Sequence, residues 1–537
     1  MKRKKFISII LSIIFSLFMI IGNSFKKSGS FDLIVKFPLK NLFFFLLLVF
    51  LFHKIIYYLF GKIDTFSFQE KKSKSRLVIL FEKHPFLFCL IIMLICWLPY
   101  IIAFYPAILS PDPSYQIMQY FGIDNKYSTY AILLDENVII TNHHPVVHTL
   151  LLGSMVKIGT IIGNVNIGLF LYSLIQIIIL ASTLSYTIKF MKSLNVSNCY
   201  CFICLAIYGL VPVFPFYSMS AVKDVIFGCL IILYIISIYK LTTSKEIKKM
   251  MIVKQIILMI LMILFRNNGI HVILLSFPFL FFLGKKNLKK YLLIFLIVIS
   301  FNVTYNKIIL PYFKITPSSI REMLSIPFQQ TARYTRDYSD EISEEEKQII
   351  DKLLDYDTLA TRYKPEISDP VKNKFNPYYT NEDLKNYFSV WFGGLTKHPF
   401  TYIEATIENT YGYFYPLKTN WYFYHNYDTR IVKKGFDYHY NGLSVIREIL
   451  TLLGKKFPYI PVLGLIVNIG FNSWLLLFIA GYLLYKKKYK ELIVLLPSFV
   501  LLLVCVASPV NTYFRYALPN IFGMPLLIGI FLSLSKN

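Results

Sequence analysis

Runs of apolar residues, each about the length that crosses a bilayer, recur along this 537-residue chain and constrain its fold more than any other feature. The first runs from Phe6 to Gly22, and the next two cover about 41–60 and 85–105. A transmembrane helix needs roughly 20 mainly apolar residues, because lipid offers the backbone no hydrogen-bond partners. Hydrophobic residues make up 56% of the chain, above the share of roughly 45–50% that is usual in soluble domains. The sequence therefore predicts an all-α integral membrane protein.

Basic residues set the predicted orientation. The first apolar run follows "MKRKK" and lacks a small-residue cleavage site, which indicates a retained helix with a cytoplasmic N-terminus. Later lysine clusters include "KEIKKMMIVK" and "GKKNLKK". All of them can be cytoplasmic under two conditions. The segment 145–163 must not cross the membrane, and Gln255–Leu283 must be an in-out-in hairpin of two short helices broken at "FRNNG". This arrangement gives about 11–13 transmembrane helices in the cell membrane, with both termini cytoplasmic. The net charge of +26 then reflects orientation, and no nucleic-acid partner is expected.

One long polar region interrupts the apolar pattern and holds most of the 30 acidic residues. Ser343, three residues before Glu346, predicts a capping box at the start of a solvated helix. The aromatic stretch 409–427 is typical of a membrane interface and could also stack on sugar faces. We therefore divide the chain into an N-terminal transmembrane module at 1–312 with a first large outer loop at 106–144, an extracytoplasmic, mainly helical domain at 313–457, and C-terminal transmembrane helices at 458–537.

Charged or titratable residues within or beside apolar runs carry the strongest functional signal, because they are unfavourable in a bilayer. They are Asp112, His143, His144, His148, Lys223, Asp224, Arg266, His271 and Arg515, and Asn267 follows one of them in the predicted hairpin break. The predicted topology brings most of them to the outer membrane face. We therefore predict an extracytoplasmic site.

Each residue also has a structural alternative. Asp112 lies between two prolines and could simply form an Asx turn, and Lys223 and Asp224 could pair with each other. His148 could be a core histidine, and Arg515 could extend its charge to the membrane surface. It is the convergence of these residues at one face that favours a functional site.

An acid and several cations at one membrane face suit the transfer of a group from a phosphate-linked lipid to a hydroxyl. The cations bind the phosphate and stabilise its charge as it leaves, while the carboxylate accepts the proton of the attacking hydroxyl. Arginine suits this role better than lysine, because its planar guanidinium matches phosphate oxygens. We take Asp112 as the catalytic residue, and His143, His144, Lys223, Asp224, Arg266, Asn267 and Arg515 as substrate-binding residues.

Several of these motifs resemble known families. Asp112 just after an early apolar helix, "HP" at His144–Pro145 opening a short apolar helix, and "RNNG" within a broken hairpin resemble the GT-C glycosyltransferases, especially protein O-mannosyltransferases and aminoarabinose transferases. The resemblance implies that Asp112 is the catalytic base and that Arg266 and Arg515 bind phosphate. The larger set "YPAILSPDPSYQ", "NHHPVVHT", "AVKD", "FRNNG", "IPFQQTAR", "ISDPVKN" and "FRYALP" resembles an uncharacterised family of bacterial multi-pass membrane proteins.

These features together predict a membrane glycosyltransferase that moves a sugar from a polyprenyl-phosphate donor to a cell-envelope acceptor on the outer face. The alternative is a transporter or flippase of envelope lipids or polymers, which would use the same cations as a path for lipid phosphate. Cys199, Cys201 and Cys204 open an apolar run with no further ligands nearby, so no metal site is assigned. No cofactor is assigned either, and a requirement for a divalent metal is left open.

Overall fold

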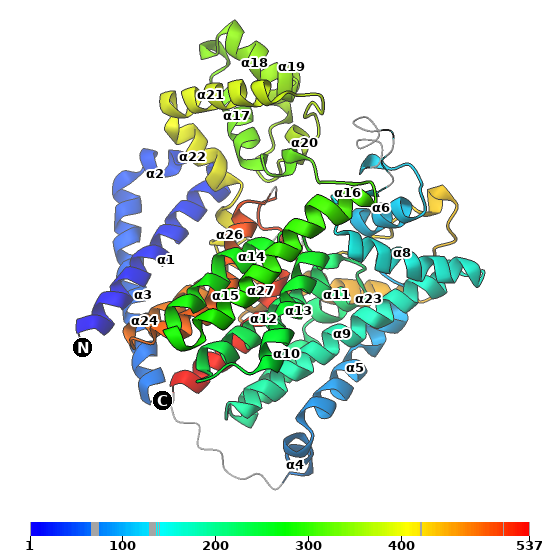
Figure 1. Cartoon of the computed structure of the whole chain (residues 1–537). Coiled ribbons are helices and arrows are strands. Elements are labelled where there is room, and N and C mark those ends of the chain that lie inside the picture. Colours follow the sequence, from blue (N-terminus) through cyan, green and yellow to red (C-terminus); the bar gives the residue numbers. More distant parts are fainter. Residues whose placement is uncertain are drawn as a thin grey trace.

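The computed structural model describes residues 2–65, 75–127, 136, 138, 140–418, 422–508 and 510–535. Within these residues the chain is almost entirely helical, and the only paired strands are β1 (Ile140–Thr141) and β2 (Ile315–Thr316). Part of the predicted outer loop 106–144 lies outside the described residues. Figure 1 shows a tilted bundle of long helices with a smaller group of short helices at one end, which we call the domain end of the bundle.

Within the part of the chain that the structure describes, eight helical segments are long and apolar enough to cross a membrane. They are α1 (Lys2–Ser28), α3 (Pro38–Thr65), α5 (Pro85–Ala103), α9 (Val165–Ser193), α12 (Lys223–Thr243), a span at Lys286–Tyr312 formed by α15 (Lys285–Thr304) and α16 (Leu310–Tyr312), a span at Tyr489–Val506 formed by α25 (Tyr489–Leu492) and α26 (Leu496–Val506), and α27 (Phe514–Ser535). The bent pair α10 (Asn198–Leu210) and α11 (Val213–Met219) brings the number to nine if it forms one span. The chain is thus an all-α, multi-pass membrane protein.

Shorter apolar helices fill out the bundle. The segments are Val146–Ile162, Gly269–Leu283 and Ile469–Tyr485, the last of which is α24. The predicted count of 11–13 spans is reached only if these shorter helices are included. Figure 1 shows α8 (Val146–Ile161) beside α6 (Pro111–Tyr120) at the domain end, whereas α9 continues to the opposite end. This placement fits the prediction that 145–163 does not cross.

The predicted hairpin break is confirmed. Helix α13 (Lys249–Phe265) ends at Arg266, and α14 (Gly269–Ser276) begins three residues later and continues into a 3-10 turn. A side chain at Gly269 would collide with the backbone of Met262, so the two helix ends can meet this closely only at a glycine. The break therefore holds Arg266 at a fixed point between two helix ends.

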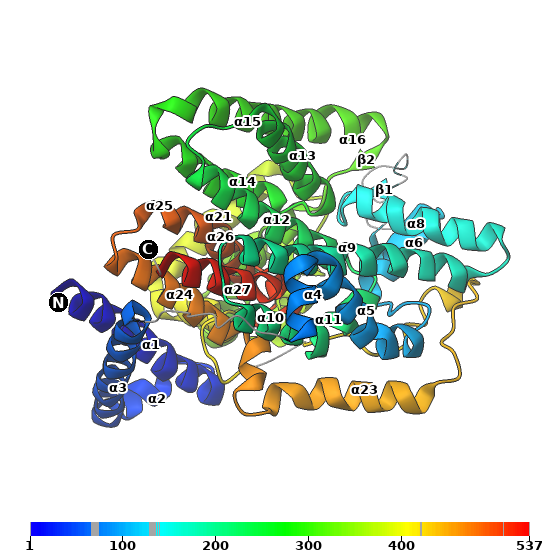
Figure 2. The same cartoon turned by 90° about the horizontal axis from the view of Figure 1, so that it is seen from below.

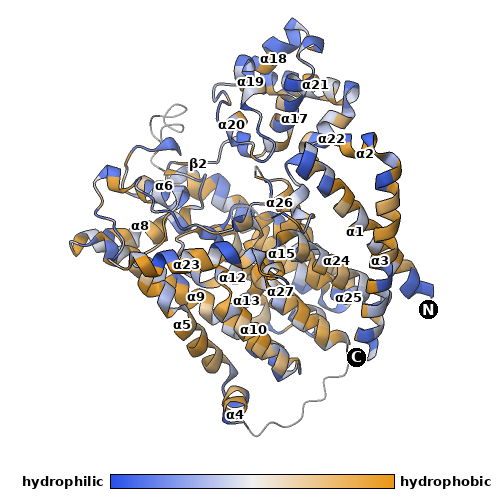
Figure 3. Cartoon of the chain, turned by 180° about the vertical axis from the view of Figure 1, so that it is seen from behind, coloured by the Kyte–Doolittle hydropathy of each residue, from blue (hydrophilic) through white to orange (hydrophobic). Residues whose placement is uncertain are grey.

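The short helices at the domain end have a hydrophobic core of their own, which includes Phe328, Leu353, Tyr387 and Tyr402. They are α17 (Ser325–Asp337), α18 (Glu344–Leu354), α19 (Tyr356–Arg362), α20 (Asp369–Lys372), α21 (Asn381–Lys397) and α22 (Pro399–Glu408). The predicted capping box at Ser343 is present. Figure 3 shows polar residues concentrated in this domain and apolar residues along the bundle, as expected for a polar domain resting on a membrane-embedded part.

After this polar domain the chain returns to the bundle. Helix α23 (Ser444–Lys456) lies on the outside of the bundle beside α5 and α11 (Figure 2). Two contacts hold it there: Arg447 donates a hydrogen bond to the carbonyl oxygen of Ala103 at 3.0 Å, and Asn441 donates one to that of Ile102 at 2.5 Å. Residues 422–457 therefore pack against transmembrane helices and not against the core formed by α17–α22.

Candidate functional site

A short backbone link between two loops places Asp112. The Ile108 amide donates to the carbonyl oxygen of Met219 at 2.8 Å, and the Ala221 amide donates to that of Ile108 at 3.0 Å. This link holds the start of α6 beside the start of α12. Pro111 is the first residue of α6, where its missing N–H and fixed φ are favourable, and Asp112 lies in the first turn, where the helix dipole favours an acid.

Asp112 meets two cations from distant parts of the chain. Its Oδ2 atom lies 2.8 Å from the Nη2 atom of Arg515 and 3.8 Å from the Nζ atom of Lys223. Lys223 is the first residue of α12, and Arg515 lies in the first turn of α27. The predicted acid and two predicted cations therefore form one ion-pair group.

Asp224 joins this group to the hairpin break. Its carboxylate contacts the guanidinium of Arg266, and its Oδ2 atom lies 3.2 Å from the Nε atom of Arg515. Lys223 and Asp224 thus do not pair with each other, and Arg515 is buried and does not extend to the surface. We call these five side chains, Asp112, Lys223, Asp224, Arg266 and Arg515, the charged cluster.

The charged cluster has more positive than negative groups. It contains three basic side chains and two carboxylates, so basic groups outnumber acidic groups by one. Asp224 is completely buried, whereas the side chain of Asp112 keeps 20% of its surface exposed. Because buried charges are stable only when paired, the surplus basic group favours an additional anion at this position. Because Asp224 is completely buried, Asp112 is the carboxylate of the cluster that a bound molecule can contact.

The two predicted histidines lie on the other side of Lys223. The Nδ1 atom of His144 accepts a hydrogen bond from Lys223 at 2.7 Å. Burial lowers the pKa of His144 well below its ordinary value, and the charge of Lys223 lowers it further. His144 is therefore neutral and positions the lysine.

His143 faces the polar domain. Its ring stacks on Tyr127 with 4.0 Å between the ring centroids, and its Nδ1 atom lies 4.0 Å from Glu322. Burial lowers the pKa of His143 to about 4, although Glu322 acts in the opposite direction. Glu322 is in turn held by Lys372 of α20 at 2.5 Å. His143 thus connects the charged cluster to the polar domain.

Backbone pairing fixes the loop 142–145, which carries His143 and His144 and which we call the histidine loop. Strands β1 and β2 pair in parallel, with Thr141 opposite Thr316, and the Asn142 amide donates to the carbonyl oxygen of Thr316 at 2.7 Å. Asn267 donates its side-chain amide to the carbonyl oxygen of Asn142 at 2.7 Å. Asn267, which we predicted to bind substrate, therefore holds the histidine loop against the hairpin break.

The charge environment keeps Asp112 ionised. Burial acts to raise the pKa of Asp112, but the neighbouring positive charge, led by Arg515, holds it well below its usual value. A carboxylate of this kind can accept a proton only from a group that becomes acidic during a reaction. The ionised form is the one that a general base requires, and the low pKa makes it a weak base.

Aromatic rings surround the two arginines. The ring of Tyr516 lies 4.9 Å from the guanidinium carbon of Arg266 and 5.7 Å from that of Arg515. Tyr513 and Tyr424 also face Arg515, at 5.0 and 5.8 Å, and their hydroxyl groups bond to each other. These cation–π contacts stabilise the charges in a partly apolar environment.

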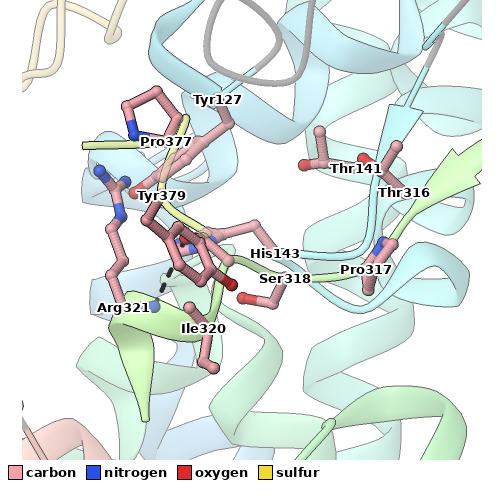
Figure 4. A pocket seen from close by; sticks show the side chains of 11 residues that line it. Tyr127, Thr141, His143, Thr316, Pro317, Ser318, Ile320, Arg321, Pro377 and Tyr379 are labelled. Carbon is pink, nitrogen blue, oxygen red and sulfur yellow. Dashed lines mark hydrogen bonds between the residues drawn. The ribbon is translucent and has the colours of Figure 1, made fainter. Parts of the chain in front are cut away.

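Two pockets flank the charged cluster. The larger, of about 600 Å³, is lined by Leu109–Pro111, by Tyr422–Arg430 and by Lys455, Pro458 and Tyr459. The smaller, of about 250 Å³, is surrounded by Tyr127, His143, Tyr379 and Arg321, together with hydroxyl groups such as that of Ser318 (Figure 4). Asp112 is the next residue after Pro111, which lines the larger pocket, and His143 lines the smaller pocket. The larger pocket also shares a residue with the surroundings of the charged cluster, because Tyr424 lines this pocket and faces Arg515 at 5.8 Å.

Two residues that carried a sequence signal lie outside the cluster. His148 is buried between Gln116 at 3.1 Å and the hydroxyl of Tyr172 at 2.7 Å, so it is a core histidine. His271 is exposed on α14. Among the described residues no group of three or more His, Cys, Asp or Glu side chains could hold a metal ion.

Sequence analysis missed several residues that surround the site. Glu322 had no local signal, because it reaches His143 only through the β1–β2 pairing. Tyr513 and Tyr516 flank Arg515 in "TYFRY", and that spacing could have suggested them. Tyr424 belongs to the aromatic stretch 409–427, which borders the larger pocket.

The fold and the site define an all-α, multi-pass membrane protein with a buried cluster of opposite charges at one end of its helix bundle. The chain belongs to DUF6020, a family of unknown function whose model matches residues 3–537. No curated protein and no solved structure matches it. The family thus accounts for the whole chain but assigns no reaction to it.

Proposed function

We propose that this protein is a membrane glycosyltransferase of GT-C type that transfers a sugar from a polyprenyl-phosphate donor to a hydroxyl of a cell-envelope acceptor. One observation carries the proposal: Asp112 is the partly exposed carboxylate of a charged cluster in which basic groups outnumber acidic ones, and the preceding residue, Pro111, lines a pocket of about 600 Å³. A transferase of this kind needs a base next to a phosphate-binding group, and the cluster offers both.

In the proposed step, a bond from the anomeric carbon to the acceptor oxygen replaces its bond to the phosphate oxygen. The acceptor oxygen attacks the anomeric carbon of the sugar, and its proton passes to a carboxylate oxygen of Asp112. The bond between the anomeric carbon and the phosphate oxygen breaks, and its electron pair stays on the lipid phosphate. Arg515, which contacts Asp112, and Lys223 stabilise the negative charge that develops there. The proton is later lost from Asp112 to solvent.

The GT-C resemblance supports this assignment at Asp112, at His144 and at the hairpin break. The sequence also departs from the GT-C pattern, which often has a second acid beside the first, where this chain has Pro113. In the structure another carboxylate, Asp224, comes from α12 and lies near a different nitrogen of Arg515, Nε, at 3.2 Å. Its complete burial between two arginines favours a structural role that orients the cations.

We propose the orientation of the site from the basic clusters. Lys290 donates a hydrogen bond to the carbonyl oxygen of Ile247 at 2.6 Å, so the clusters near 245–254 and 284–290 lie together. Lys488 bonds to the carbonyl oxygen of Leu534 and so joins a third cluster to the C-terminal helix. Figure 1 shows both ends of the chain away from the polar domain. By the positive-inside rule we place this end in the cytoplasm and the site on the outer face.

A transporter remains the alternative class. A path for a charged lipid or polymer would need charged groups that continue through the bundle toward the cytoplasmic end. Among the described residues, the buried charged side chains are Asp224, Arg266, Arg321, Arg333, Lys372, Asp428 and Arg515, and all belong to the domain end or to the polar domain. The concentration of charge at one end favours a reaction at that face over passage through the membrane.

Membranes containing the protein test the proposal when they are incubated with a panel of radiolabelled polyprenyl-phosphate sugars. We expect sugar to be released from one of these lipids and to appear in an envelope fraction. An Asp112→Asn variant should lose this transfer, and an Asp437→Asn variant should keep it, because Asp437 is exposed and away from the cluster. Transfer that is equal in all three proteins would contradict the role of Asp112. No release from any donor, together with lipid movement across vesicles, would favour the transporter.

A further inference from the structure

Helix α23 exposes an apolar strip that no other part of the described chain covers. Val445, Ile449 and Leu452 are 66%, 54% and 56% exposed, and Ile446 and Leu453 lie beside them. Residues three and four apart share one side of a helix, so these five side chains form one continuous strip along α23. A strip of this kind, held on the surface of a folded protein, indicates contact with another apolar phase.

The other sides of α23 have different environments. Leu450 and Gly454 are buried against the bundle, and a side chain at Gly454 would come within 3.0 Å of the rings of Phe423 and Phe216. Glu448 and Lys455 are exposed on a third side. The helix thus has one side toward protein, one apolar side without a partner, and one charged side, which is the pattern of a helix that lies in a membrane interface.

The apolar strip continues into the lipid-facing surface of the bundle. Helix α5 exposes a stripe of large apolar residues at helical spacing: Leu87, Ile91, Ile95, Leu98 and Ile102. The hydrogen bonds from Asn441 and Arg447 fix the start of α23 at the upper end of this stripe, at Ile102 and Ala103. Because α5 is long enough to cross the bilayer, the phase that covers its stripe is lipid, and the strip on α23 borders the same phase.

We propose that α23 lies in the outer membrane interface with its apolar strip in the lipid, and that the 600 Å³ pocket beside Asp112 opens to this lipid layer. The last turn of α23 supplies Lys455 to the pocket wall, and the segment after the helix supplies Pro458 and Tyr459. Tyr459 is 79% exposed, and Val462 three residues later is 77% exposed. The wall of the pocket is therefore continuous with the surface that contacts lipid.

This position determines the class of ligand that the pocket takes. A molecule that reaches it from the bilayer is an amphiphile, and Lys455 at the rim together with the surplus basic group of the charged cluster selects a phosphate head group. The pocket would thus receive a phosphate-bearing lipid sideways from the leaflet. The placement of α23 does not depend on the proposed transferase function, whereas the identity of the lipid as a sugar donor rests on it.

The first experiment measures the environment of α23 with nitroxide labels on introduced cysteines. The full chain is used in lipid nanodiscs, with Cys96 and Cys199 changed to serine because the other five cysteines are buried. Labels at Ile449 and Leu453 should collide more often with oxygen than with a water-soluble nickel chelate. A label at Glu448, one residue away on the charged side, should show the reverse.

Two outcomes would overturn the placement of α23 in the interface. Equal access of the nickel chelate to labels at Ile449 and Glu448 would mean that the strip faces water. Exclusion of both reagents from Ile449, with dipolar broadening between labels, would mean that a second copy of the chain covers the strip.

The second experiment tests access of the lipid to the pocket. A photoreactive benzophenone side chain replaces Tyr459, and a matched control carries it at Tyr312, which is 80% exposed on α16 at the domain end of the bundle. Illumination with a radiolabelled polyprenyl monophosphate in the nanodisc should label the protein at Tyr459. Excess unlabelled polyprenyl monophosphate should remove that label, whereas excess phosphatidylglycerol should not.

Equal labelling at both positions, or equal displacement by both lipids, would show contact with bulk lipid only and would overturn the access route. The two hypotheses can be separated. A protein that is labelled specifically at Tyr459 but transfers no sugar in the membrane assay would refute the transferase and leave the lipid-facing pocket in place. A protein that transfers sugar but shows no specific label at Tyr459 would refute the pocket.

Discussion

The two aspartates of the charged cluster should respond differently to the same substitution. Asp224 is completely buried and contacts both Arg266 and Arg515. Removing one partner from a buried ion pair leaves the other charge uncompensated, which typically destabilises a protein by about 3–5 kcal/mol. Asp224→Asn leaves two guanidinium groups with less negative charge, so we expect a loss of stability of about this size, with poor folding or a strongly lowered unfolding midpoint.

Asp112→Asn should lower turnover strongly and stability only slightly. The side chain is 20% exposed, and Arg515 keeps its contact with Asp224 at 3.2 Å. The loss of stability should be about 1–2 kcal/mol, because asparagine can still accept a hydrogen bond from Arg515. Asparagine cannot accept a proton, so turnover should fall about 10²-fold or more, which corresponds to about 2.7 kcal/mol in the activation free energy.

The comparison uses purified protein in detergent or nanodiscs. The unfolding midpoint reports stability, and release of labelled sugar per amount of folded protein reports turnover, with Asp437→Asn as the control for an exposed aspartate. Normal turnover of Asp112→Asn would refute its role as the base. A loss of stability in Asp112→Asn as large as that in Asp224→Asn would make Asp112 a structural member of the cluster.

Three further predictions follow from the topology, the hairpin break and the link to the polar domain. An impermeant thiol reagent added to intact cells should label a cysteine introduced at Ser343 but none at Lys286, because the two positions lie at opposite ends of the bundle. Arg266→Lys keeps the charge but loses the planar guanidinium, so donor binding should weaken about tenfold, the equivalent of one charge-assisted hydrogen bond. Burial acts to raise the pKa of Glu322, but Lys372, His143 and Arg321 together more than offset burial, and the pKa of Glu322 falls to about 2. The pKa of His143 falls to about 4. Both groups bind protons more readily when unfolded, so stability should decline as the pH falls below about 6.5, and Glu322→Gln should flatten the part of this decline below about pH 4.5.

Three results would contradict these expectations. Labelling at Lys286 from outside intact cells would reverse the orientation and place the site in the cytoplasm. Unchanged donor affinity in Arg266→Lys would leave Arg266 as a structural residue of the hairpin. A Glu322→Gln variant whose unfolding midpoint depends on pH as in the parent would show that Glu322 does not carry the acid sensitivity.

The sequence alone determined the class of fold and the local features that depend on neighbouring residues. Apolar runs define the crossing helices, because a bilayer requires a continuous apolar surface and a fully bonded backbone. The hairpin break at Arg266 and the capping box at Ser343 were also predictable, since each is written in a few consecutive residues. The candidate residues of the charged cluster could be selected for a similar reason, because charges within apolar runs are rare and unfavourable.

Only the tertiary structure decided how these residues are paired. Asp112, Asp224, Arg266 and Arg515 come from four separate helices or helix ends, and nothing local indicates that Arg515 bridges both aspartates. Glu322 enters the site through a pairing of two short strands that lie far apart in the chain.

The role of α23 was hidden for the same reason. Its sequence shows an amphipathic helix, but which side meets protein and which stays uncovered depends on its packing against α5. Local patterns fix where helices begin and end because they depend on contacts within a turn. The chemistry of the site depends on which helix ends the folded bundle brings together, and those contacts join residues from separate helices and loops that no local pattern links.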